Sequence, residues 1–236
     1  MQVEIWTDVN CPFCYLGKKR FNDALDQFEH ANAVQVTHRS FELDPTVPAG
    51  TSGSVIEHLA HKYGRTLEQA ADGERQLGAA ANDAGLDYVT SGRDYGNSFD
   101  MHRLLHWART LGRQEAMLDA LYLANFADEA ALFGSDERLV HVAVGAGFDE
   151  AAVADVVGDK TRYADDVRSD EAQAQEFGVQ GVPFYVFDRT YAVSGAQPVE
   201  TFAQALTQAW GDRPAAPQIL NADGDACGPD GCAVPQ

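Results

Sequence analysis

The chain carries two pairs of cysteines, one near each end. Cys11 and Cys14 form a C-x-x-C motif, and Cys227 and Cys232 form a C-x4-C motif. These four are the only cysteines of the 236-residue sequence. Closely spaced pairs of this kind indicate thiol chemistry or metal binding rather than a framework of structural disulfides.

The first pair has the spacing of a redox-active motif. We expect Cys11 to cap a helix that begins at Pro12, where free backbone amides and the helix dipole lower the pKa of a thiol. Cys14 would lie one turn further on and be more buried. A thiolate of Cys11 would attack a disulfide to give a mixed disulfide, which Cys14 would resolve. Run backward, the same pair oxidises a substrate dithiol.

Metal binding and inert thiols are the alternatives for this pair. A zinc site needs two more ligands, and the only further thiols lie in the distant tail, so redox chemistry is favoured and no metal site is predicted. His102 and His106 would share a helix face, as metal ligands can, but no Glu follows His102 as in H-E-x-x-H motifs. A helix packed near the redox site is the favoured interpretation of the two histidines.

A second candidate element is Gly181-Val182-Pro183, just before an apolar run. The proline is either an ordinary edge or bulge proline or a cis proline in a tight turn, and the residues alone leave both open. Opposite a thiolate, Pro183 would give no amide hydrogen to the sheet. The backbone of Val182 would then stay free to pair with an extended substrate segment.

The elements that must position these residues begin as β-α-β. Residues 2–7 alternate as a strand, a helix follows from Pro12, and residues 34–38 predict a second strand that runs on toward Leu43. An Ala-rich stretch broken by glycines then predicts five or six helices. The remaining elements are a helix at 161–177, a hairpin of residues 182–188 and 191–193, a last helix from Pro198 to Trp210, and a flexible tail at 211–236.

The composition excludes several classes of partner. Against 36 Asp and Glu stand 17 Lys and Arg, and the resulting net charge of -19 opposes binding to nucleic acid or to an anionic membrane. No apolar run reaches membrane-spanning length and no signal peptide is recognised, so a cytoplasmic protein is predicted. The Asp-rich, Lys-poor composition indicates either a high-salt cytoplasm, hence a halophilic source, or an acidic protein of a GC-rich genome.

Four ordered motifs carry a resemblance to a known family. They are Asp8 to Gly17, Phe41 to Pro45, Asn97 to Ala108 and Gly181 to Pro198. With them the chain resembles the DsbA-like branch of the thioredoxin superfamily, and within it the FrnE subgroup. The resemblance implies an α/β fold, namely a thioredoxin fold with a large all-helical insertion.

The resemblance also implies domain boundaries and residue roles. The thioredoxin fold would occupy residues 1–47 and 161–210, with the helical insertion at 48–160 and the tail at 211–236. Cys11 would be the nucleophile, Cys14 the resolving thiol and Pro183 the cis proline. The residues expected to contact substrate are Pro12, Phe13 and Val182.

The predicted function is that of a thiol-disulfide oxidoreductase or protein disulfide isomerase. It would act on protein or small-molecule thiols and disulfides without a bound cofactor, with glutathione, another low-molecular-weight thiol or a reductase as electron partner. Many FrnE-like proteins have Trp where this chain has Phe13, so the direction stays open. The related hydroxychromene carboxylate isomerases lack the paired cysteines and use glutathione. A glutathione-dependent isomerase of a small aromatic substrate is one alternative, and a metal-binding or redox-sensing thiol protein is another.

The second cysteine pair lies in the tail, and some FrnE-like proteins carry a C-terminal pair of this spacing. A disulfide in a terminal loop attached to nothing gives the core no stability. The hypothesis is therefore that Cys227 and Cys232 exchange with Cys11 and Cys14 as an auxiliary redox pair. Capture of a soft metal and an uncoupled tail are the alternatives.

Overall fold

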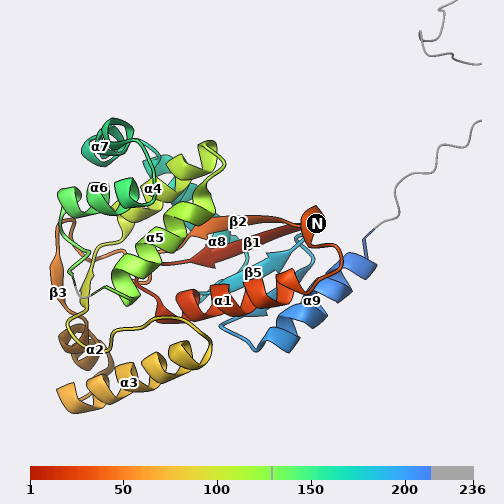
Figure 1. Cartoon of the computed structure of the whole chain (residues 1–236), viewed down its shortest axis with the longest axis horizontal. Helices are drawn as coiled ribbons and strands as arrows, with labels where there is room; N and C mark the ends of the chain where they lie inside the picture. The colour runs from red at the N-terminus through yellow and green to blue at the C-terminus, as the bar shows by residue number, and fades with distance from the viewer. Residues whose placement is uncertain (129, 214–236) are drawn as a thin grey trace, which may run out of the picture.

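A computed structural model describes residues 1–128 and 130–213, in which the C-x-x-C motif follows the first strand of a four-stranded sheet. Its strands are β1 (Gln2–Thr7), β2 (Gln35–Ser40), β5 (Phe184–Phe187) and β6 (Tyr191–Ser194), in the order β2-β1-β5-β6. Strand β2 runs parallel to β1, whereas β5 runs antiparallel to β1 and pairs with β6 as a hairpin. The predicted β-α-β start and the predicted hairpin are thus neighbours in one sheet (Figure 1).

Helices cover both faces of this sheet. On one face lie α1 (Pro12–Asp26) and α9 (Val199–Gly211), which run side by side (Figure 1). Val3 and Ile5 of β1 face them, in a core with Phe21 of α1 and Phe202 of α9. Helix α8 (Ala164–Glu176) packs against β2 on the other face, where Trp6 is buried. Because β1 is an inner strand between two helical layers, both its faces are buried.

Glu4 shows why the alternation of β1 is imperfect. The sequence pattern places this residue at a polar edge, but its carboxylate is buried on the α8 face of the sheet. Arg39 approaches it at 2.6 Å and Arg189 at 3.0 Å, so the charge is paired where it leaves water. Burial is tolerated because two guanidinium groups replace the lost hydration.

Six helices form the insertion, which agrees with the predicted five or six. They are α2 (Val55–Tyr63), α3 (Leu67–Asp83), α4 (Phe99–Thr110), α5 (Gln114–Phe126), α6 (Asp136–Gly145) and α7 (Glu150–Gly158). The sequence did not predict the short antiparallel ribbon of β3 (Ser52–Ser54) and β4 (Asp94–Gly96). No helix among residues 1–128 and 130–213 is long and apolar enough to cross a membrane.

The insertion packs directly on the C-x-x-C motif. The largest apolar core joins Cys11, Cys14 and Tyr15 to the buried side chains of α4, α5, α6 and α7. The ring of Tyr15 stacks on Phe126 of α5, with centroids 5.2 Å apart and planes 11° apart. Contacts of this kind fix the start of α1 against the insertion.

Candidate active site

Cys11 is the capping residue of α1, as the sequence predicts. Its backbone is extended, with φ at -91° and ψ at 109°, and Pro12 occupies the first turn. The amides of Cys14 and Tyr15 donate to the carbonyl of Cys11, at 2.9 and 3.3 Å. No side chain caps the helix, and Pro12 has no amide hydrogen, so the Phe13 amide and the helix dipole remain to stabilise a negative charge at this end.

Cys14 lies beside Cys11, and both side chains are free thiols in the structure. The predicted contrast in burial is small, because 3% of Cys11 and 1% of Cys14 are exposed. Burial raises the pKa of the Cys14 thiol well above its usual value, and the neighbouring Cys11 adds to the rise. The hydroxyl of Thr7 and the backbone amide of Asp8 act in the opposite direction, because they hydrogen-bond the sulfur of Cys14.

The Val182–Pro183 peptide bond is cis and faces this thiol pair. The thiol of Cys11 donates to the carbonyl oxygen of Val182 at 3.5 Å, and the amide of Gly195 donates to the carbonyl of Pro183 at 2.8 Å. Thus the loop before β5 touches the start of α1. Of the two readings of Pro183 that the residues left open, the structure has the cis proline.

Gly17 makes the close approach of α1 to this loop possible. A Cβ atom added there would lie 2.6 Å from the hydroxyl of Tyr185 and 2.9 Å from Cγ of Pro183. Side chains essentially never come so close without a shift of their neighbours, so only glycine fits. Tyr185 is fully buried, and its hydroxyl has no hydrogen-bond partner among the described residues.

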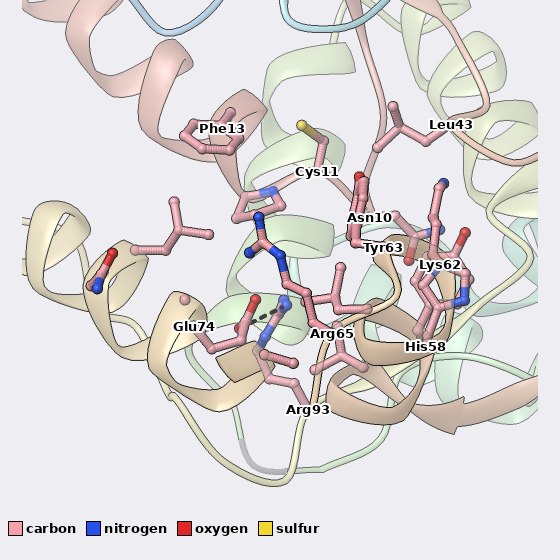
Figure 2. Close-up of a pocket in the computed structure, with 18 of the residues that line it drawn as sticks. Asn10, Cys11, Phe13, Leu43, His58, Lys62, Tyr63, Arg65, Glu74 and Arg93 are labelled. Atoms are coloured by element: carbon pink, nitrogen blue, oxygen red, sulfur yellow. Dashed lines mark ion pairs between the residues drawn. The ribbon is translucent and has the colours of Figure 1, made fainter. Parts of the chain in front are cut away.

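A cavity of about 600 Å³ opens beside Cys11 (Figure 2). One side is made by the start of α1 and by Val182, and the other by α2, α3 and β4 of the insertion. The apolar part of its lining includes Phe13, Leu43, Val55, Leu59, Leu77 and Val182. This volume lies in the usual range of small-molecule sites.

A buried ion pair lies at the insertion side of the cavity (Figure 2). Arg93 and Glu74 approach at 3.2 Å with side chains 2% and 1% exposed, and Tyr88 donates its hydroxyl to Glu74 at 3.0 Å. The guanidinium of Arg93 also lies over the ring of Phe126, 4.6 Å from its centroid, and donates to Asn125 at 3.3 Å. The charge of Glu74 is therefore balanced inside the protein.

His102 and His106 lie on α4 but do not converge on one point. Nε2 of His102 lies 3.5 Å from a carboxylate oxygen of Asp8, whereas Nε2 of His106 lies 3.1 Å from both Asp170 and Ser40. Burial opposes a charge on His102, but the Asp8 carboxylate outweighs it and the pKa of His102 is raised. The described residues contain no group of three or more side chains suited to hold a metal ion.

The structure brings some of the predicted site residues together and does not describe the others. The structure brings Cys11, Pro12, Phe13 and Val182 to one wall of the cavity, with Cys14 and Pro183 beside them. The tail residues Cys227 and Cys232 lie outside the described residues. Sequence reasoning did not single out the residues on the insertion wall, among them Lys62, Arg65, Glu74, Arg93 and Tyr95.

Comparison with known proteins agrees with this geometry. Residues 2–207 match the family model of the DSBA-like thioredoxin domain. The chain belongs to this family. The DSBA-like chain is 56% identical to a probable DsbA oxidoreductase from Streptomyces coelicolor, with both chains covered to 100% and a TM-score of 0.91. The predicted thioredoxin fold with a helical insertion is confirmed. No curated protein matches the sequence.

More distant structures share the fold of this DSBA-like protein. A cytosolic disulfide reductase, DsbM, from Pseudomonas aeruginosa, solved with glutathione, is 16% identical with a TM-score of 0.59, and 88% of this chain and 98% of that chain are covered. A 2-hydroxychromene-2-carboxylate isomerase is 15% identical with a TM-score of 0.60, over 88% and 95% of the two chains. At these identities the likeness concerns the fold alone.

Proposed function

We propose that the protein is a thiol-disulfide oxidoreductase in which Cys11 is the nucleophile and Cys14 the resolving thiol. The observation that carries the proposal is the placement of Cys11 at the free N-terminus of α1, on the wall of a cavity and 3.5 Å from the cis-proline loop. A sulfur in this position can meet an incoming disulfide while the helix end stabilises its anion. Such exchange needs no bound cofactor.

The reaction proceeds through a mixed disulfide. The thiolate of Cys11 attacks one sulfur of the substrate disulfide, forms a Cys11–substrate bond and expels the other substrate sulfur as a thiolate. Cys14 then loses its proton, attacks the sulfur of Cys11 and expels the second substrate thiolate. Two electrons pass from the cysteine pair to the substrate, and a Cys11–Cys14 disulfide remains. The reverse steps oxidise a substrate dithiol.

Neighbours of Cys14 support the resolving role. Its thiol is held neutral by burial, so it does not compete with Cys11 for the first attack. When the proton leaves, the hydroxyl of Thr7 and the amide of Asp8 remain as donors to the sulfur. A second hydroxyl, of Tyr122, is hydrogen-bonded to Thr7 and can keep it oriented.

Protein or small-molecule thiols and disulfides are the proposed substrates, with Pro12, Phe13 and Val182 as contact residues. Phe13 is 49% exposed and offers an apolar surface next to Cys11 in the cavity lining. Glutathione or another low-molecular-weight thiol is the proposed electron partner.

We place the protein in the cytoplasm and in the FrnE subgroup.

Insulin reduction tests the proposal, in a Cys227→Ser, Cys232→Ser background that removes the tail thiols. We expect Cys11→Ser to abolish reduction and Cys14→Ser to accumulate a mixed disulfide with insulin that dithiothreitol releases. Insulin reduction by Cys11→Ser at the unmodified rate would show the proposal to be wrong. The reduction potential of the pair then gives the direction: a value near that of thioredoxin means a reductase, and a much higher value an oxidase or isomerase.

A glutathione-dependent isomerase of a small aromatic substrate is a second candidate, because the cavity is large enough for such a molecule and apolar over much of its lining. Glutathione would bring its own sulfur to that reaction. Isomerase turnover that survives in Cys11→Ser would therefore favour this candidate over disulfide exchange.

The proposed auxiliary role of Cys227 and Cys232 has its own test. If these thiols pass electrons to or from Cys11 and Cys14, the Cys227→Ser, Cys232→Ser double variant should turn over insulin more slowly than the unmodified protein. Equal rates would contradict the exchange between the two pairs.

A further inference from the structure

Lys62 and Arg65 are two of the five basic residues of this acidic chain that form no ion pair with a described residue. Most of its 17 Lys and Arg form ion pairs within the described part of the structure. Although the chain has 36 Asp and Glu, neither Lys62 nor Arg65 lies within 4.0 Å of a carboxylate oxygen among the described residues. Of the other bases without an ion pair, Arg20 and Arg113 donate to backbone carbonyls and Arg109 lies outside the cavity lining. Arg65 lies 5.7 Å from the ring centroid of Tyr63, and neither Lys62 nor Arg65 donates a hydrogen bond among the described residues.

Both bases line the cavity that contains Cys11 (Figure 2). Lys62 lies in the last turn of α2 and Arg65 in the turn that joins α2 to α3. In Figure 2 the Arg65 side chain lies between Cys11 and the Glu74–Arg93 pair. The α2–α3 corner of the insertion therefore presents two cations to the space in front of the nucleophile.

Nearby groups offset these charges only in part. Glu74 is the one acidic side chain in the lining, and Arg93 and Tyr88 already bind it. Asp44 lies outside the lining; its carboxylate attracts the charge of Lys62 but forms no ion pair with it within 4.0 Å.

The other groups of the lining do not add negative charge. Burial and the neighbouring Lys62 lower the pKa of His58, so its ring is neutral at pH 7. Nε of Arg93 is a further buried donor that has no acceptor in the described part of the chain.

From this arrangement we infer that the cavity binds a small disulfide or thiol that carries carboxylate groups, with Lys62 and Arg65 binding the carboxylates while the sulfur meets Cys11. The inference rests on the proposed disulfide chemistry and names its substrate class. The volume of about 600 Å³ suits a molecule of this size, and the apolar side chains can cover its methylene groups. A folded acidic protein would instead be repelled by the negative charge of this chain, whose net value is -19.

The reaction balances without a further reagent when the cysteine pair starts reduced. Cys11 attacks the anionic disulfide and releases one carboxylate-bearing thiolate, and Cys14 releases the second. The substrate gains two electrons and the pair becomes a Cys11–Cys14 disulfide. One turnover can thus be followed by the fraction of the pair that is oxidised.

The experiment compares three disulfides of similar size as single-turnover oxidants of the reduced full-length protein. They are 3,3′-dithiodipropionate, which is a dianion, the neutral bis(2-hydroxyethyl) disulfide, and cystamine, which is a dication. Samples are quenched with acid and alkylated, and the peptide containing Cys11 and Cys14 is quantified by mass. The measured quantity is the ratio of the dianion rate to the neutral rate, which corrects for a general change in reactivity.

We expect a ratio of about ten in the unmodified protein, the effect of two solvent-accessible charge contacts, and the lowest rate with cystamine. Lys62→Gln together with Arg65→Gln should bring the ratio close to one, whereas Lys62→Arg should keep it. Arg109→Gln is the matched control, because Arg109 also lacks an ion pair among the described residues but lies outside the cavity lining.

Two results would contradict the inference and leave the proposed function intact. One is an unchanged ratio in the Lys62, Arg65 double variant, and the other is an equal loss in Arg109→Gln. If none of the three disulfides oxidises the pair while the protein still exchanges with insulin, the inference is wrong and the proposed function stands; if insulin exchange is also absent, the proposed function is wrong as well. The two failures are therefore distinguishable in one set of measurements.

Discussion

The sulfur atom of Cys11 lies 3.5 Å from the carbonyl oxygen of Val182, although 171 positions separate the two residues in the chain. The contact joins the start of α1 to the loop before β5. Any substitution that separates these two segments should change both stability and thiol exchange, because they share one packed contact region.

Gly17→Ala is the substitution that tests this contact. The added methyl group meets Tyr185 and Pro183, so we expect a loss of about 1–3 kcal/mol in the free energy of unfolding and slower reduction of insulin. Gly145→Ala is the control, because nothing lies within 4 Å of a Cβ there. Urea unfolding of both variants measures the difference, and equal stability would show that α1 and the loop can separate freely.

The Asp8–His102 pair should make stability depend on pH. The pKa of His102 is raised in the folded protein, so its stabilising effect is complete below its ordinary value of 6.5 and is lost as the pH rises through the raised pKa. The unmodified protein should therefore exceed His102→Gln in stability most at acidic pH, with a gap that narrows toward pH 8. Urea unfolding over this range measures the gap. The exposed His61 supplies the control variant, His61→Gln, which should follow the slope of the unmodified protein.

Glu74→Gln should destabilise the insertion. The change leaves the guanidinium of Arg93 buried without its counter-charge, which costs about 3–5 kcal/mol in comparable buried pairs. Asp72→Asn on the same helix removes only the exposed partner of Arg75 and should cost less than about 1 kcal/mol. Thermal unfolding of the two variants distinguishes them, and similar midpoints would contradict the burial of the Glu74 charge.

Added salt should stabilise the protein. Mutual repulsion of the charges behind the net -19 opposes the compact state, and salt screens it. The free energy of unfolding in urea should rise as potassium chloride is increased to about 2 M, beyond what sucrose at equal osmolality produces. A halophilic source predicts a rise that continues to molar salt. Stability that peaks at low salt would favour the alternative explanation of the composition, an acidic protein of a GC-rich genome.

Local signals in the sequence were sufficient for much of the site. Pro12 after Cys11 predicts the start of α1, and the apolar runs on either side of residues 188–190 predict the β5–β6 hairpin. Both features depend on neighbours in the chain. The state of the Val182–Pro183 bond depends on tertiary packing, so the residues alone left it open and only the family resemblance implied it.

Other parts of the site had no sequence signal. The three-residue strands β3 and β4 are too short to show alternation, and Asp94 in β4 is held by the amides of Leu132 and Phe133 from far along the chain. Lys62 and Arg65 have no fixed spacing from Cys11. Their place in the cavity lining becomes known only from the folded chain.

The wall of the cavity is divided between two parts of the chain. Cys11 belongs to α1, whereas Lys62 and Arg65 belong to the corner between α2 and α3. Evolution can therefore remodel that corner while the electron-transfer pair stays intact. The side of the cavity that would select a substrate thus lies on a different part of the chain from the thiols that would react with it.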